Sequence, residues 1–246
     1  MKPKQLLKYL ILCFSISWVC WGALAALIWL DVLTFYHPVG IALHLAGGFG
    51  PTFAGIWVRS GKFIPTKIIP FIFHANKKTF RYLLLLMGMA AAVIGLSSME
   101  IQANLDWLVL PLVFIGAVLI YGGNEEVGWR GIMQPALEKH MPFPFAAIIT
   151  GITWAVWHLP LWLIDGTSQY GFPFWMYAIF AVLLSFMLAG LYKRSGSVFY
   201  CGILHGFCNL LLTIFAIHVN IILYIGIIII LITSVCLWYP KWTKSK

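Results

Sequence analysis

Acidic side chains are scarce in this protein. Asp and Glu together number 7 in 246 residues, against 16 Lys and Arg. Charged residues of both signs make up 9% of the chain, whereas a soluble domain has about 25%. Hydrophobic residues make up 62%. So little charge excludes a soluble globular enzyme, and it predicts an all-α, polytopic membrane protein with a single transmembrane domain over residues 1–246.

Several familiar catalytic patterns are lacking as well. The chain has no HExxH zinc motif, and its 5 Cys lie in apolar segments without the spacing of a metal site or of a disulfide framework. One of them, Cys201, precedes His205 by one helical turn, but no basic neighbour or helix N-terminus is present to activate its thiol. The Cys residues are therefore interpreted as small packing residues, and a cysteine nucleophile is not expected.

Long apolar runs are abundant instead. A helix that crosses a bilayer needs about 20 mainly apolar residues. The runs predict eight transmembrane helices, over residues 7–30, 39–58, 82–102, 105–124, 144–164, 172–192, 197–217 and 219–239.

The basic residues indicate how these helices are oriented. If the N-terminus is cytoplasmic, all 16 Lys and Arg fall on the cytoplasmic side, while Asp31, Glu100, Asp106 and Asp165 fall on the other. Cytoplasmic loops of membrane proteins carry an excess of Lys and Arg. The pattern predicts that both termini are inside. The net charge of +9 is then explained by basic residues on the cytoplasmic side, where they face the lipid bilayer. A nucleic-acid partner is not expected.

Ionisable side chains at membrane depth are costly, so they are the candidate functional residues. The first set, within YGGNEEVGWRGIMQ at 121–134, contains Glu125, Glu126 and Arg130. Glu126 and Arg130 are one helical turn apart, so they share a helix face and can form an ion pair. Neighbouring carboxylates disfavour each other's ionisation, and an arginine relieves one of them. Glu126 is then predicted to stay paired, which leaves Glu125 as the general base.

Two further polar sets lie on later predicted helices. His158 follows Trp154 by four residues in WAVWH, and Asn209 follows His205 by the same spacing in HGFCN. A carboxylate, two imidazoles and an amide on three helices can activate a water molecule and stabilise an oxyanion. Each set alone also has a purely structural explanation: an ion pair, a core histidine, or interhelical hydrogen bonds. Those explanations do not account for three such sets in this order.

These three motifs, Glu-Glu-x-x-x-Arg, aromatic-x-x-x-His and His-x-x-x-Asn on successive apolar helices, resemble those of the CPBP intramembrane proteases. That family comprises the CAAX prenyl endopeptidases and their bacteriocin-processing relatives, also called the Abi family. The matching residues extend from Glu125 to Asn209, and the longer forms EEVGWRG and WHLP strengthen the match. One departure is Trp154, because the family usually has Phe at this place.

The resemblance implies an intramembrane endopeptidase that uses activated water to cleave a hydrophobic peptide or a membrane protein. Glu125 matches the carboxylate that activates the water, and Glu126 with Arg130 matches its supporting pair. His158 matches the histidine that helps to hold the water.

The resemblance also assigns His205 and Asn209, which match a pair proposed to stabilise the oxyanion or to bind metal. If a divalent metal such as Zn is used, His158 and His205 are its expected ligands. A glutamate-activated mechanism without metal is the alternative, and the sequence leaves both open.

The uniform cytoplasmic face and short outer loops favour a bacterial plasma membrane, where the family-implied role is bacteriocin or peptide processing, or self-immunity. Two other functions remain open. One is a non-catalytic membrane scaffold or immunity protein that retains the motifs for its structure. The other is a proton-coupled transporter, since membrane-depth Glu and His also form proton relays. A transporter predicts inverted repeats, which the sequence does not show.

The predicted spans place the candidate residues at different depths. Glu125 lies at the inner end of the span 105–124, whereas His158 lies about 21 Å from the inner end of the span 144–164 at 1.5 Å per residue. Tilted helices and a later start of the fifth helix would reconcile the two. We expect both, with the site in an inward-facing polar cavity near the cytoplasm.

Overall fold

The computed structural model describes residues 3–61, 64–98, 100–101 and 106–239. Within them the regular elements are helices, and one isolated bridge joins Ile101 to Phe215. The prediction of an all-α fold is therefore confirmed. The chain forms two compact units, of which the first takes the described parts of Met1–Ile69 with Asn124–Ser185. The second takes those of Pro70–Gly123 and Phe186–Lys246.

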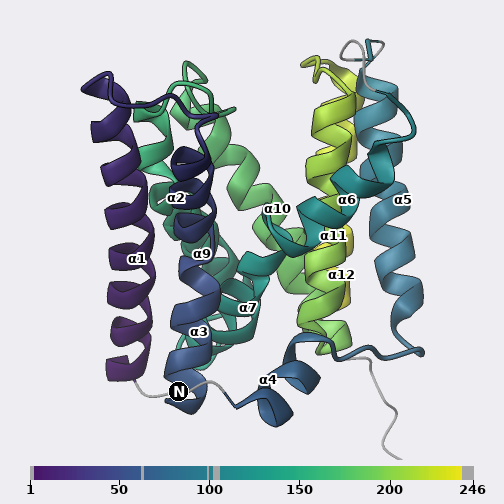
Figure 1. Cartoon of the computed structure of the whole chain (residues 1–246). Coiled ribbons are helices and arrows are strands. Elements are labelled where there is room, and N and C mark those ends of the chain that lie inside the picture. The colour runs from purple at the N-terminus through teal and green to yellow at the C-terminus, as the bar shows by residue number, and fades with distance from the viewer. Residues whose placement is uncertain (1–2, 62–63, 99, 102–105, 240–246) are drawn as a thin grey trace, which may run out of the picture. The chain divides into compact units, whose positions relative to one another are not determined.

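The first unit begins with α1 (Pro3–Trp29), which packs against α2 (Pro38–Gly48) and α3 (Gly50–Ser60) (Figure 1). Small residues allow this close approach. The Ser17 hydroxyl donates to the Gly47 carbonyl at 2.7 Å, and a Cβ on Gly50 would overlap the Ser17 side chain. The Gly-rich junction between α2 and α3 bends the pair by 43°.

The polar motif EEVGWRG occupies a series of short helical turns. They are η1 (Gly123–Glu125), α7 (Glu126–Gly128), the π-helical turn η2 (Trp129–Met133) and α8 (Gln134–Leu137). Such π-turns occur often at functional sites. Then come α9 (Phe143–Trp157) and η3 (Leu159–Leu163).

Close packing of glycines fixes the motif against α3. A Cβ on Gly55 would lie 3.3 Å from the Cα of Gly128, and a Cβ on Gly128 would lie 2.5 Å from the Pro51 carbonyl oxygen. The backbones of α3 and α7 therefore touch, which leaves no room for side chains between them.

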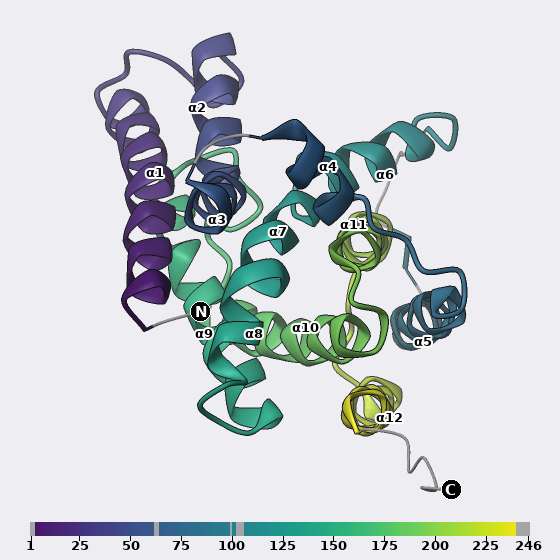
Figure 2. The ribbon, with the colours of Figure 1, turned by 90° about the horizontal axis from the view of Figure 1, so that it is seen from below.

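The second unit contains α5 (Phe80–Ser97), α6 (Leu110–Leu119), α11 (Val198–Ile214) and α12 (Ile221–Trp238). In Figure 2, α5, α11 and α12 are seen nearly end-on and α6 from the side. Helix α11 packs against α5 and α6, and α12 packs against α5. Two helices contribute to both units: the short α4 (Pro65–Ile72) and the long α10 (Phe174–Ser195).

Every predicted apolar span contains a helix, and most of these helices are long enough to cross a bilayer. By length and composition, six helices within the described ranges qualify, and the bent pair α2–α3 would be a seventh. Helix α11, with 17 residues, is a shorter apolar helix. The chain is thus a multi-pass membrane protein with six or seven candidate spans where eight were predicted. The six are Pro3–Trp29, Phe80–Ser97, Leu110–Leu137, Phe143–Leu163, Phe174–Ser195 and Ile221–Trp238.

Some residues used in the sequence argument are outside the described part of the chain. They are the span ends at 102 and 105 and the basic residues Lys2, Lys62, Lys241, Lys244 and Lys246.

The fourth span corrects the expected position of Glu125. It was predicted to end at residue 124, but the candidate span continues to Leu137. This candidate span includes Glu125, Glu126 and Arg130, of which Glu126 and Arg130 are paired and fully buried. Helix α9 begins at Phe143, so the later start expected for the fifth helix is wrong.

Candidate active site

The predicted ion pair between Glu126 and Arg130 is present. The Nε of Arg130 lies 3.1 Å from the Oε2 of Glu126, and both side chains have no exposed surface. The Nη1 of Arg130 also donates to the Ser185 hydroxyl at 3.3 Å, and that hydroxyl donates to the Ala147 carbonyl at 2.8 Å. A buried charge without a partner is costly, so this pair binds the motif to α9 and α10 as a unit.

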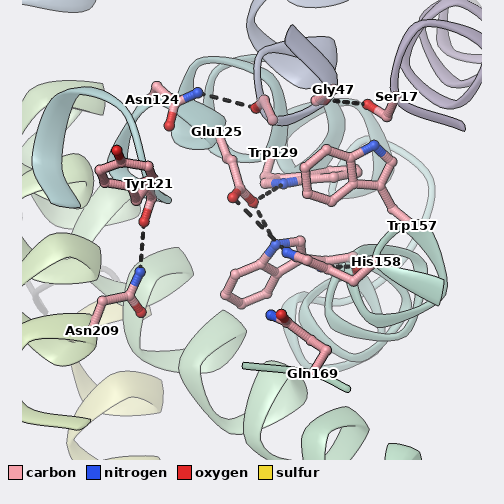
Figure 3. Close-up of polar contacts among 12 residues, drawn as sticks. Ser17, Gly47, Tyr121, Asn124, Glu125, Trp129, Trp157, His158, Gln169 and Asn209 are labelled. Atoms are coloured by element: carbon pink, nitrogen blue, oxygen red, sulfur yellow. Dashed lines mark hydrogen bonds and ion pairs between the residues drawn. The ribbon is translucent and has the colours of Figure 1, made fainter. Parts of the chain in front are cut away.

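Glu125 has different partners from its neighbour. Its Oε2 accepts a hydrogen bond from the indole Nε1 of Trp129 at 3.2 Å and another from the Nε1 of Trp154 at 2.6 Å (Figure 3). Only 6% of Glu125 is exposed. The two adjacent carboxylates are thus distinguished as the spacing predicts: Glu126 contacts a cation, and Glu125 contacts neutral donors.

His158 faces the second oxygen of Glu125. The Nδ1 of His158 lies 2.9 Å from the Trp154 carbonyl oxygen, which can only accept, so Nδ1 carries a proton. In the neutral ring, Nε2 is then the nitrogen without a proton, and this atom lies 4.0 Å from Glu125 Oε1. That distance is too long for a direct hydrogen bond. A water molecule about 2.8 Å from each atom would bridge them, and the angle at the water oxygen between the two atoms would be about 90°.

The position of His158 follows from the way in which α9 ends. Helix α9 ends at Trp157, and His158 is its C-cap residue. The helix does not continue because Pro160 has no backbone N–H to donate to the preceding turn. The Trp157 carbonyl at this end accepts a hydrogen bond from the Trp18 indole at 2.9 Å. The ring of His158 packs against that of Trp157 (centroids 4.5 Å apart) and that of Tyr177 (5.2 Å). The imidazole is therefore fixed by α1, α9 and α10.

The peptide before Glu125 is anchored at the bend between α2 and α3. The Thr52 hydroxyl donates to the Asn124 carbonyl at 2.6 Å, and the Asn124 amide donates to the Gly48 carbonyl at 3.1 Å. Figure 3 shows Asn124 beside Glu125 in this arrangement. The broken helix pair thus holds the motif through the Thr52 hydroxyl and the Gly48 carbonyl.

The remaining predicted residues, His205 and Asn209, lie in the second unit beside Gly122. The Nδ2 of Asn209 donates to the Tyr121 carbonyl at 2.8 Å (Figure 3). Gly122 has a φ of 130°, and a Cβ there would lie 2.6 Å from Asn209 Nδ2 and 2.8 Å from His205 Nε2. Both side chains are therefore on one face of α11, as their spacing predicts, and they contact the backbone just upstream of Glu125.

The first unit offers few ligands for the divalent metal, such as Zn, that the sequence leaves open. Within the first unit, Glu125 and His158 are the two nearby ligand types, and Glu125 Oε2 is already bonded to two indole N–H groups. Among the residues that the structure describes, no three His, Cys, Asp or Glu side chains form a group that could hold a metal ion. Zinc sites in proteins take three or four such ligands.

The sequence analysis missed two donors to Glu125. Trp129 is one helical turn after Glu125, the same spacing as Glu126 to Arg130, so the spacing rule could have found it. Trp154 enters the motif only as the aromatic residue four places before His158, although its departure from the usual Phe was a signal. Ser185 had no signal in the sequence, because it is far from Arg130 along the chain.

Comparison with known proteins agrees with this geometry. Residues 106–211 match the family model of the type II CAAX prenyl endopeptidases, Rce1-like. This stretch of the chain is therefore similar to the CAAX endopeptidase family. This Rce1-like stretch contains all of the candidate residues from Glu125 to Asn209. The resemblance noted from the motifs is confirmed.

A relative of established name matches part of the chain. The CAAX prenyl protease 2 of Methanococcus maripaludis is 34% identical over 61 residues. The match covers 25% of this chain and 22% of that protein. The chain thus matches about a fifth of the relative's length.

Proposed function

We propose that this protein is an intramembrane endopeptidase in which Glu125 activates a water molecule held by His158. The observation that supports this most directly is the approach of His158 Nε2 to Glu125 Oε1 at 4.0 Å, inside a segment that matches the endopeptidase family. Both side chains are 8% exposed, so a bound water would be largely removed from bulk solvent.

The chemistry follows from the orientation of the two groups. One O–H of the water points to Glu125 Oε1 and the other to the Nε2 lone pair of His158, which leaves the oxygen lone pairs for the substrate. The proton passes to Oε1 as the water oxygen bonds to the peptide carbonyl carbon. Glu125 then delivers that proton to the departing amine nitrogen as the C–N bond breaks. Water and peptide give a carboxylic acid and an amine, and base catalysis of this kind contributes about 10²–10⁴-fold.

His205 and Asn209 are proposed to stabilise the oxyanion, as the motif resemblance implies. The amide group of Asn209 has two N–H donors, and the bond to Tyr121 uses one of them. The imidazole of His205 is a second donor on the same face of α11. Donors of this kind at an oxyanion are worth about 10²–10³-fold in kcat.

The proposed setting is a membrane protein with eight spans, both termini inside, and an inward-facing polar cavity. The single-sided distribution of Lys and Arg supports this topology. The substrate class is a hydrophobic peptide or membrane-protein segment, and the family match supports a CAAX-like peptide. Bacteriocin or peptide processing, or self-immunity, in a bacterial plasma membrane is the proposed physiological role.

The test is cleavage of fluorogenic peptides by protein purified into lipid nanodiscs. Prenylated CAAX peptides and unprenylated hydrophobic peptides are compared. The wild type is expected to cleave one class, and Glu125→Gln is expected to abolish cleavage without a change in thermal stability. Glu138→Gln, a carboxylate outside the site, is the control and should cleave normally. Cleavage retained in Glu125→Gln would contradict the mechanism. A folded wild type that cleaves neither class would favour a scaffold.

A further inference from the structure

The two indole donors of Glu125 converge on a single oxygen. Trp129 belongs to η2, one turn after Glu125, and Trp154 belongs to α9. Both indole N–H groups nevertheless donate to Oε2. Both rings are buried, with 0% and 2% of their surface exposed. Oxygen Oε1, in contrast, is the one beside His158. The carboxylate is therefore held asymmetrically.

This asymmetry decides which oxygen receives a proton. A carboxylate oxygen has about two lone-pair sites, and two N–H donors fill those of Oε2. Bonds from N–H groups to a charged acceptor are also stronger than neutral ones, so they fix the side-chain rotamer. The proton from water is then directed to Oε1, which is the oxygen within water-bridging distance of His158.

Trp154 contacts both members of the catalytic pair. Its indole N–H donates to Glu125, while its backbone carbonyl accepts from His158 Nδ1. The same residue thus fixes the position of the carboxylate and the tautomer of the imidazole. The Phe that the family usually has could supply the carbonyl but not the N–H.

We propose that Trp154, together with Trp129, is a positioning residue that binds Glu125 Oε2 and so assigns proton transfer to Oε1. This proposal builds on the proposed function, because it concerns the same carboxylate. It adds two residues that act through Glu125, and it distinguishes this chain from relatives with Phe at the same place.

Kinetics provide the first test. Trp154→Phe keeps an aromatic ring but removes the donor, so kcat is expected to fall about 10- to 100-fold with KM nearly unchanged. The matched control is Trp157→Phe. Trp157 is fully buried in the same aromatic cluster, and its Nε1 has no hydrogen-bond partner among the described residues. This control measures the cost of lost ring volume, including any shift of the His158 ring that packs against Trp157. Equal loss in the two variants would overturn the proposal.

The two donors should also be coupled. Because Trp129 and Trp154 bind the same oxygen, the double variant Trp129→Phe/Trp154→Phe is expected to lose less kcat than the product of the single losses. Independent, multiplicative losses would contradict a shared action on Oε2.

Indole NMR tests the contact without any substrate. In protein labelled with ¹⁵N-Trp in nanodiscs, Glu125→Gln is expected to shift the Nε1–H signals of Trp129 and Trp154 and to leave that of Trp157 in place. The signals are assigned with the three Trp→Phe variants. An unchanged Trp154 signal would overturn the proposal, even if Glu125 is catalytic. Shifted signals in a protein that cleaves nothing would support the contact while the proposed function fails.

Discussion

The imidazole of His158 approaches Glu125 with its Nε2 atom. Nδ1 is bonded to the Trp154 carbonyl at 2.9 Å, and Nε2 lies 4.0 Å from Glu125 Oε1. A histidine in this tautomer accepts a hydrogen bond from water and does not donate one to the carboxylate. The relationship suits a residue that orients water for a base.

Replacement of His158 with Asn tests this role. The shorter amide cannot reach the water, so kcat is expected to fall about 10²-fold or more. The double variant Glu125→Gln/His158→Asn should be no less active than Glu125→Gln alone, since both residues act on one water. His140→Gln, at an exposed position, is the control. A multiplicative further loss in the double variant would contradict a shared water.

The buried ion pair predicts a stability effect that a second substitution reverses. Arg130→Met leaves Glu126 buried without its cation, which costs about 3–5 kcal/mol of unfolding free energy. The double variant Glu126→Gln/Arg130→Met is expected to recover most of this loss. Ser185→Ala, which removes one hydrogen bond to Arg130, should cost about 1–3 kcal/mol. Thermal unfolding in detergent measures all three. A double variant as unstable as Arg130→Met would contradict this account.

Gly122 is expected to tolerate no side chain. Its φ of 130° is strained for Ala, and the added Cβ would press on His205 and Asn209. Gly122→Ala should lower the unfolding free energy by about 1–3 kcal/mol and reduce kcat, because both candidate oxyanion donors must move. The matched control is Gly22→Ala in α1, where a Cβ meets nothing within 4 Å. There the stability should rise by about 0.5–1 kcal/mol. Equal effects at both glycines would refute the steric argument.

Chelation tests the mechanism without metal. Dialysis against EDTA or 1,10-phenanthroline is expected to leave kcat unchanged, and elemental analysis should find far less than one zinc per chain. The reason is the donor set, in which Glu125 Oε2 is bonded to indoles and His158 Nδ1 to a carbonyl. Activity lost on chelation and restored by zinc would show that a further ligand completes a metal site.

Residues that share a helix face could be predicted from the sequence, and contacts between helices could not. The pairs Glu126–Arg130 and His205–Asn209 follow from the four-residue spacing, which is a local rule. The bonds from Trp154 to Glu125 and from Arg130 to Ser185 depend on how α9 and α10 pack against the motif. Spacing along the chain carries no information about that packing.

The length of the fourth span shows a second limit. Hydropathy treats each charge as a cost, so the run was predicted to stop before Glu125. By length and composition the candidate span extends to Leu137, and within it Glu126 and Arg130 form a buried ion pair. A hydropathy sum adds one value for each residue, so it does not include the interaction between two residues.

Residues 125 and 126 are the same amino acid, and their different environments come from what stands one turn later. Trp129 gives position 125 a neutral donor, and Arg130 gives position 126 a full charge. A chain of identical composition with Trp129 and Arg130 exchanged would place the guanidinium on the acid beside His158. In the proposed mechanism the base would then be held in a salt bridge, so the order of Trp129 and Arg130 along the chain decides which of the two carboxylates can accept a proton from water.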